Sequence, residues 1–108
     1  MFFNLYEERY KKMGLTDFRL KNLDDIEAIY NVNCRYIDGV ERLQATSRTF
    51  RRFLLNFYNG WGLEARETIR PISVKYLKDK VNGVYLRFDY WMYGERHWLH
   101  VKNENTWY

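Results

Sequence analysis

The chain has 108 residues with 7 Phe, 10 Tyr and 4 Trp, and 30% of its residues are charged, for a net charge of +4. A chain of this length is expected to form a single domain over residues 1–108, which excludes a two-domain enzyme with separate cofactor and substrate domains. The balance of apolar and charged residues is typical of a folded globular protein, and it excludes a disordered, collagen-like or strongly charged chain.

Cysteine content and apolar runs bear on the compartment. Cys34 is the one cysteine, so no internal disulfide can form, and the longest purely apolar runs are three or four residues, too short to span a membrane. The N-terminal segment lacks the basic region of a signal peptide. We therefore expect a cytoplasmic protein with no membrane partner.

Basic residues are distributed unevenly along the chain. Residues 1–34 carry 5 basic and 6 acidic side chains, whereas residues 35–108 carry 13 and 8. The later part therefore holds all of the excess positive charge, and a surface that binds anions is expected there.

The first half has the periodicity of helices. Residues 2–13 form the first predicted helix, because the apolar side chains recur every three or four positions and Gly14 supplies a stop. A second helix begins after an N-cap at Asn22, with Asp25 three residues later, and ends near Asn31. From Val32 to Gln44 the pattern is mixed, and both a hairpin turn at Asp38-Gly39 and a broken helix fit it.

The strongest helical pattern covers residues 48–59. Phe50, Phe53, Leu54 and Phe57 form one apolar face, Thr46 or Ser47 is expected to cap the start, and Gly60 ends the helix. The opposite side is basic, with Arg48, Arg51 and Arg52 in the first turns. These arginines are either ordinary solvated charge or a contact for an anion such as phosphate.

Beyond Pro71 the pattern becomes extended. Three strands are predicted at residues 72–78, 84–92 and 95–102, joined by a loop with Asn82-Gly83 and a tight turn at Tyr93-Gly94. The predicted fold class is therefore α+β, with N-terminal helices, three in number, packed on a C-terminal three-stranded antiparallel β-meander.

The tight turn also predicts a register for the last two strands. A two-residue turn pairs Met92 with Glu95, and counting back from there leaves one face of the hairpin apolar. Because side chains alternate along a strand, the other face is aromatic and cationic. Its predicted binding residues are Tyr85, Arg87, Trp91, Arg96, Trp98, His100 and Lys102.

Three interpretations of this face remain open from the sequence. Rings interleaved with cations are used to read single-stranded nucleic acids. The same residue types supply most hot spots of protein interfaces. Alternatively, the first helix or the 32–44 segment covers the face and buries its rings.

Catalytic motifs are not found in the sequence. His97 and His100 lie three residues apart, which on a strand sends them to opposite faces and prevents them from holding one metal ion. Neither a nucleophile elbow nor a glycine-rich phosphate loop is present. No metal, no cofactor and no enzymatic activity are expected, and the catalytic alternative is a small metal-independent ribonuclease using His100 beside Arg87 or Arg96.

The segment from Phe53 to Trp61 has the pattern F-x-x-x-F-x-N-G-W. It resembles the end of a helix in phage-encoded anti-CRISPR proteins, which inhibit Cas nucleases. The resemblance covers nine residues and implies a cytoplasmic inhibitor from a mobile element that acts by docking on a nuclease. No site residue follows from it.

The sequence thus predicts a non-catalytic binding protein that inhibits or regulates a protein partner by docking on it. Binding of RNA or single-stranded DNA is the alternative, and a toxin-type ribonuclease is a third. A homodimer is also compatible with the sequence.

Overall fold

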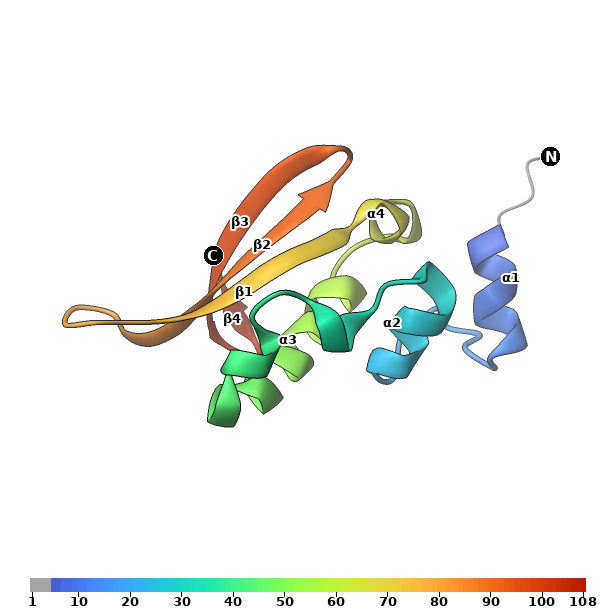
Figure 1. Cartoon of the computed structure of the whole chain (residues 1–108). Coiled ribbons are helices and arrows are strands. Elements are labelled where there is room, and N and C mark those ends of the chain that lie inside the picture. The colour runs from blue at the N-terminus through green and yellow to red at the C-terminus, as the bar shows by residue number, and fades with distance from the viewer. Residues whose placement is uncertain (1–4) are drawn as a thin grey trace.

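The fold is described for residues 5–108 in a computed structural model, and it is α+β (Figure 1). The helices are α1 (Leu5–Lys12), α2 (Leu23–Tyr30), α3 (Ser47–Asn59) and α4 (Leu63–Thr68). The strands are β1 (Arg70–Asp79), β2 (Gly83–Met92), β3 (Glu95–Asn103) and β4 (Thr106–Trp107). They form one antiparallel sheet in the order β1-β2-β3-β4. The predicted fold class is confirmed, but the sheet has a fourth strand and α4 was not predicted.

The two N-terminal helices match their sequence signals to different degrees. At α2 the Asn22 side chain accepts from the Asp25 backbone N–H at 3.0 Å, the Asn22 backbone N–H donates to the Asp25 carboxylate at 3.2 Å, and Asn31 ends the helix in the left-handed conformation. The spacing of apolar residues predicts Met13 on the apolar face of the first helix, but α1 ends at Lys12 and Met13 is 39% exposed. The predicted start at residue 2 lies outside the described residues.

The mixed segment before α3 is a broken helix. It contains single 3₁₀ turns at Cys34–Tyr36, Val40–Arg42 and Gln44–Thr46, and the hairpin alternative is wrong. Gly39 has φ 93°, and the backbone N–H of Val74 donates to the Asp38 carbonyl at 2.8 Å. The segment therefore runs along the edge of β1 and not over a face of the sheet.

Helix α3 begins without the predicted side-chain cap. The 3₁₀ turn at Gln44–Thr46 runs directly into the helix, and the Thr46 hydroxyl donates to the Leu43 carbonyl at 2.7 Å. The hydroxyl therefore does not cap the first turn of α3. The predicted apolar face is confirmed. On β2, the centroid of the Phe88 ring lies 5.7 Å from that of Phe50, 5.5 Å from that of Phe53 and 5.7 Å from that of Phe57, all three on α3.

The predicted register of the β2–β3 hairpin is confirmed over seven pairs, from Leu86 opposite Val101 to Met92 opposite Glu95. Tyr93 and Gly94 both have positive φ, as a two-residue hairpin turn requires. The short strand β4 then divides the last two rings between the faces of the sheet. Trp107 packs edge-on against Phe53 at 5.2 Å, and Tyr108 lies against His100 on the other side at 5.5 Å.

The core lies between α3 and the face of the sheet that we call the inner face, whose buried side chains are Val74, Leu86, Phe88, Tyr90, Leu99 and Val101. Figure 1 shows α3 beneath the sheet, with α1 and α2 beyond it on the same side. The periodicity of the sequence predicts that Trp61 and Tyr76 are core residues, but their side chains are 36% and 48% exposed. Trp61 follows the end of α3, and Tyr76 lies in the second half of β1.

Candidate functional site: the outer face of the sheet

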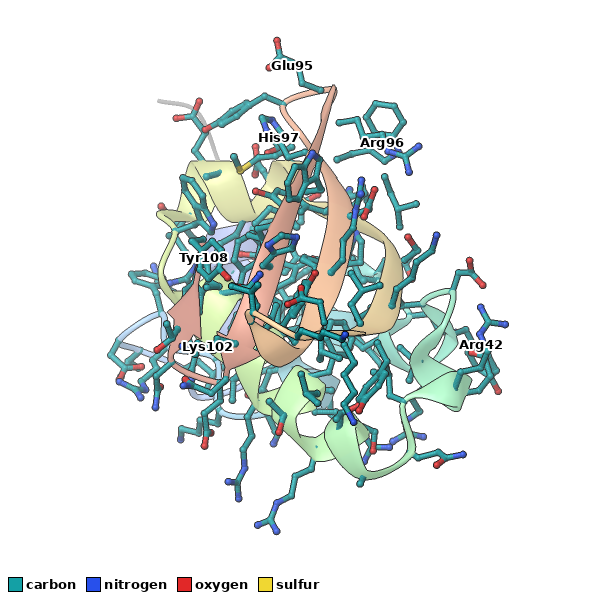
Figure 2. The ribbon with its side chains drawn as sticks, turned by 90° about the vertical axis from the view of Figure 1, so that its left-hand side faces the viewer. Arg42, Glu95, Arg96, His97, Lys102 and Tyr108 are labelled. Atoms are coloured by element: carbon teal, nitrogen blue, oxygen red, sulfur yellow. The ribbon has the colours of Figure 1, made fainter. Side chains whose placement is uncertain are left out.

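The opposite side of the sheet, which we call the outer face, is open to solvent. Its side chains come from β1 (Ser73, Lys75, Leu77 and Asp79), β2 (Tyr85, Arg87, Asp89 and Trp91) and β3 (Arg96, Trp98, His100 and Lys102), with Tyr108 after β4. Trp91 and Trp98 are 43% and 53% exposed. Figure 2 looks at this side and shows strands in front of helices, with Arg96 toward the β2–β3 turn and Lys102 at the other end of β3. Within residues 5–108 no helix covers this face, so the alternative in which the chain buries these rings is wrong.

A buried carboxylate organises the centre of the outer face. Asp89 accepts from Arg87 Nε at 2.9 Å and from Arg96 Nη2 at 3.1 Å, and only 7% of its side chain is exposed. Burial raises the pKa of the Asp89 carboxyl, but the hydrogen bonds and charges of Arg87 and Arg96 outweigh burial and hold the pKa below its usual value. Asp89 is therefore an anion that fixes both guanidinium groups.

The rings of the outer face contact one another across three strands. The His100 ring lies 4.7 Å from Tyr85, 5.0 Å from Trp98 and 5.5 Å from Tyr108. The Arg87 guanidinium lies 4.7 Å from the centroid of the Trp98 ring, an arrangement worth about 0.5–1 kcal/mol at an exposed site. Trp98 thus has one side occupied by a cation, and His100 is enclosed by neighbouring rings.

The exposed charge on the outer face is mainly positive. Lys75 and Lys102 are exposed and make no ion pair within the described residues. Arg87 and Arg96 have 40% and 57% of their side chains exposed, whereas their shared carboxylate on Asp89 is almost completely covered. A molecule that approaches this face therefore meets rings and mostly cations, with one exposed carboxylate, Asp79, at the β1–β2 end next to Tyr85.

Sequence reasoning placed seven predicted residues on this face, and the structure brings them together on β2 and β3. It placed Asp89 on the face without counting it among the binding residues, and it did not place the β1 members or Tyr108 there. Strand alternation also places Asp89 on the face, but its pairing with two arginines cannot be deduced from a one-dimensional pattern. Lys75 required the β1–β2 register, and Tyr108 required β4, which is too short to give a signal.

The three arginines of α3 do not belong to the outer face. Arg48, Arg51 and Arg52 lie on the solvent side of a helix whose other side packs on the inner face. Arg52 pairs with Glu104 at 3.5 Å, so one of the three already has a counter-charge. The sequence-predicted binding residues therefore fall on two separate surfaces.

The catalytic alternatives from the sequence depend on the two histidines of β3 and on the arginines near them. His97 stacks on Tyr90 of the inner face at 5.5 Å while His100 lies on the outer face, which confirms that the two histidines cannot share a metal ion. Among residues 5–108, no three side chains of the metal-binding types gather into a possible ion site. Arg87 lies opposite His100 in the β2–β3 register, and these residues belong to the ribonuclease alternative. The two arginines of that alternative, Arg87 and Arg96, both donate hydrogen bonds to Asp89.

Comparisons with known proteins find no matching family model, curated protein or solved structure. Within the described part of the chain, no helix has the length and apolarity needed to cross a membrane. The geometry of the outer face therefore carries the functional argument.

Proposed function

We propose that this chain is a non-catalytic binding protein that inhibits or regulates a protein partner by docking through the outer face of its sheet. The observation that carries the proposal is Trp98, half exposed and held against Arg87, whose guanidinium is fixed by Asp89. Tryptophan, tyrosine and arginine dominate the binding energy of protein interfaces. Residues already fixed in the free protein lose little conformational entropy on docking.

A protein partner fits the geometry better than a single-stranded nucleic acid. Sequence-tolerant readers stack successive bases on open ring faces and hold phosphates with free cations. Here one side of Trp98 faces Arg87, His100 is enclosed by rings, and the two arginines share Asp89. Binding of RNA or single-stranded DNA is thus the outcome that would replace the proposal.

An inhibitor of a Cas nuclease, of the anti-CRISPR type, is one form that such a docking protein takes. The segment that carries the resemblance ends α3, where the Asn59 amide exchanges two hydrogen bonds of 2.9 Å with the backbone of Leu20. This part of the segment holds the helices together, so the docking surface of such an inhibitor would still be the outer face.

The proposal is tested by affinity capture and cross-linking from a lysate of the source cells, with and without nuclease treatment. Trp98→Ala should abolish capture of the partner. The matched control is Tyr36→Ala, which removes an aromatic side chain that is 82% exposed but does not belong to the outer face, because it lies in a 3₁₀ turn. Equal capture by wild type and Trp98→Ala, or capture lost on nuclease treatment, would refute docking on a protein through this face.

A further inference from the structure

We propose that the outer face is built for an acidic protein surface, so that the partner presents clustered carboxylates around an apolar contact for Trp98; this inference rests on the proposed function. The observation behind it is the sign of the accessible charge. Asp89, the central carboxylate of the face, is enclosed by the two guanidinium groups that it binds, and Asp79, at the β1–β2 end, accepts hydrogen bonds from the backbone N–H groups of Val81 and Asn82. Lys75, Arg87, Arg96 and Lys102 are left to meet the partner.

The arginines keep hydrogen-bond donors for such a partner. Arg87 donates to Asp89 through Nε and Nη2, and Arg96 donates through Nη2. Within residues 5–108, no hydrogen bond engages Nη1 of Arg87 or Nε and Nη1 of Arg96. A guanidinium has five N–H donors in a rigid plane and pairs with carboxylates through two parallel bonds. The free donors are therefore already oriented for partner carboxylates.

The cost of burying the cations excludes the other protein surfaces. Docking removes water from these side chains, and a buried charge that finds no counter-charge is strongly unfavourable. A neutral apolar surface offers no compensation. A second copy of this chain, apposed through the same face, would place Arg96, Lys75 and Lys102 against like charges, which disfavours a homodimer through this surface.

The experiment compares two polyanions of matched charge, a poly-L-glutamate peptide and single-stranded oligothymidylate, added to isotope-labelled full-length protein and followed by NMR chemical shifts. The shifts caused by the peptide should concentrate on β2, β3 and the Trp98 indole N–H. The double variant Lys75→Glu/Lys102→Glu should weaken peptide binding by about tenfold or more. The charge-matched control Arg48→Glu/Arg51→Glu, on the solvent side of α3, should change it by less than about threefold.

Two results would overturn the inference. Tighter binding of oligothymidylate to the same residues would assign the face to a nucleic acid, and equal weakening by both double variants would show that only net charge matters. With the captured partner itself, Lys75→Glu/Lys102→Glu should slow association about tenfold. Loss of capture in Trp98→Ala together with unchanged association of Lys75→Glu/Lys102→Glu would defeat the acidic partner while leaving the docking function intact.

Discussion

The Arg87 guanidinium lies over the indole of Trp98, with 4.7 Å between its Cζ atom and the ring centroid, while its Nε donates to Asp89 at 2.9 Å. One side chain thus links a buried anion to an exposed ring. Because both contacts exist in the free protein, the rotamers of Arg87 and Trp98 are fixed before any partner arrives. The outer face is consequently a preorganised surface. Its arrangement depends on the carboxylate of Asp89, which holds both arginines in place.

Replacing Asp89 by Asn removes the charge but keeps the size of the side chain. The two guanidinium groups that now share a carboxylate would lie close together without a counter-charge, and the free energy of unfolding at neutral pH should fall by about 1–3 kcal/mol. Urea denaturation measures this loss. Asp38→Asn is the matched control, because its pair with Arg42 at 3.4 Å is largely exposed and should contribute less than about 1 kcal/mol. Similar losses in both variants would contradict the central role of Asp89.

The contribution of Asp89 should also depend on pH with a defined sign. Burial raises the pKa of this carboxyl, but Arg87 and Arg96 lower it further, so the folded pKa lies below the ordinary value of 3.8. A group with a lowered folded pKa stabilises the protein above its unfolded pKa and loses that stabilisation as the pH falls through its folded pKa. The difference in unfolding free energy between wild type and Asp89→Asn should therefore be constant from neutral pH to about 5 and shrink below 3.8. A difference that grows in acid would refute the ion pairing.

Arg66 is a buried cation that holds the helices together, and replacing it should be costly. It is 7% exposed and donates to the Tyr10 hydroxyl at 2.9 Å, to the Phe18 carbonyl at 2.6 Å and to the Trp61 carbonyl at 2.8 Å. Arg66→Lys cannot reach these acceptors together, so thermal or urea unfolding should show a loss of about 2–4 kcal/mol. Arg42→Lys, at an exposed position, should change stability by less than about 0.5 kcal/mol. A small loss in Arg66→Lys would show that water or other groups satisfy the same carbonyls.

Parts of this fold follow from local signals, and others do not. The capping box at Asn22 and the turn at Tyr93-Gly94 each fix a structure within a few residues of themselves, and both predictions were confirmed. Helix α4 and strand β4 have six and two residues. Elements so short are not stable alone and form because tertiary contacts hold them, so periodicity in sequence cannot reveal them. The role of Arg66 is also hidden, because two of its acceptors, Tyr10 and Phe18, lie far away in sequence.

The candidate site shows the same division. Strand alternation places Trp98 and Arg87 on one face, because the period of two depends only on the backbone. Alternation does not predict which elements cover that face. Trp98 is exposed because the helices lie on the other side of the sheet, which depends on tertiary packing. It also cannot show that Asp89 neutralises two of the arginines predicted for binding, which is a matter of side-chain geometry.

Gly39 is expected to be the least replaceable of the glycines with positive φ. Its φ of +93° disfavours any side chain, and a Cβ at this position would overlap the carbonyl oxygen of Val74 on β1. Gly39→Ala should therefore lower the free energy of unfolding by about 2–4 kcal/mol, as measured by urea denaturation. Gly14→Ala separates the two causes, because Gly14 has φ +75° with no atom within 4 Å of a built Cβ, and it should cost only about 1 kcal/mol. Equal losses in the two variants would show that the backbone of β1 at Val74 moves aside for the added methyl group, so that the overlap itself costs nothing.

Cys34 should be chemically inert in the folded protein. Burial, followed by the negative charge of Glu27, raises the pKa of the thiol to about 12, and the residue is 3% exposed. Because the thiolate is the reactive form, labelling with an aromatic disulfide reagent at pH 8 should be at least about a hundredfold slower in the native protein than in urea. The labelling rate should rise with denaturant in step with unfolding, and Cys34→Ser should give no signal. Rapid labelling of the native protein would instead indicate an accessible thiolate at Cys34.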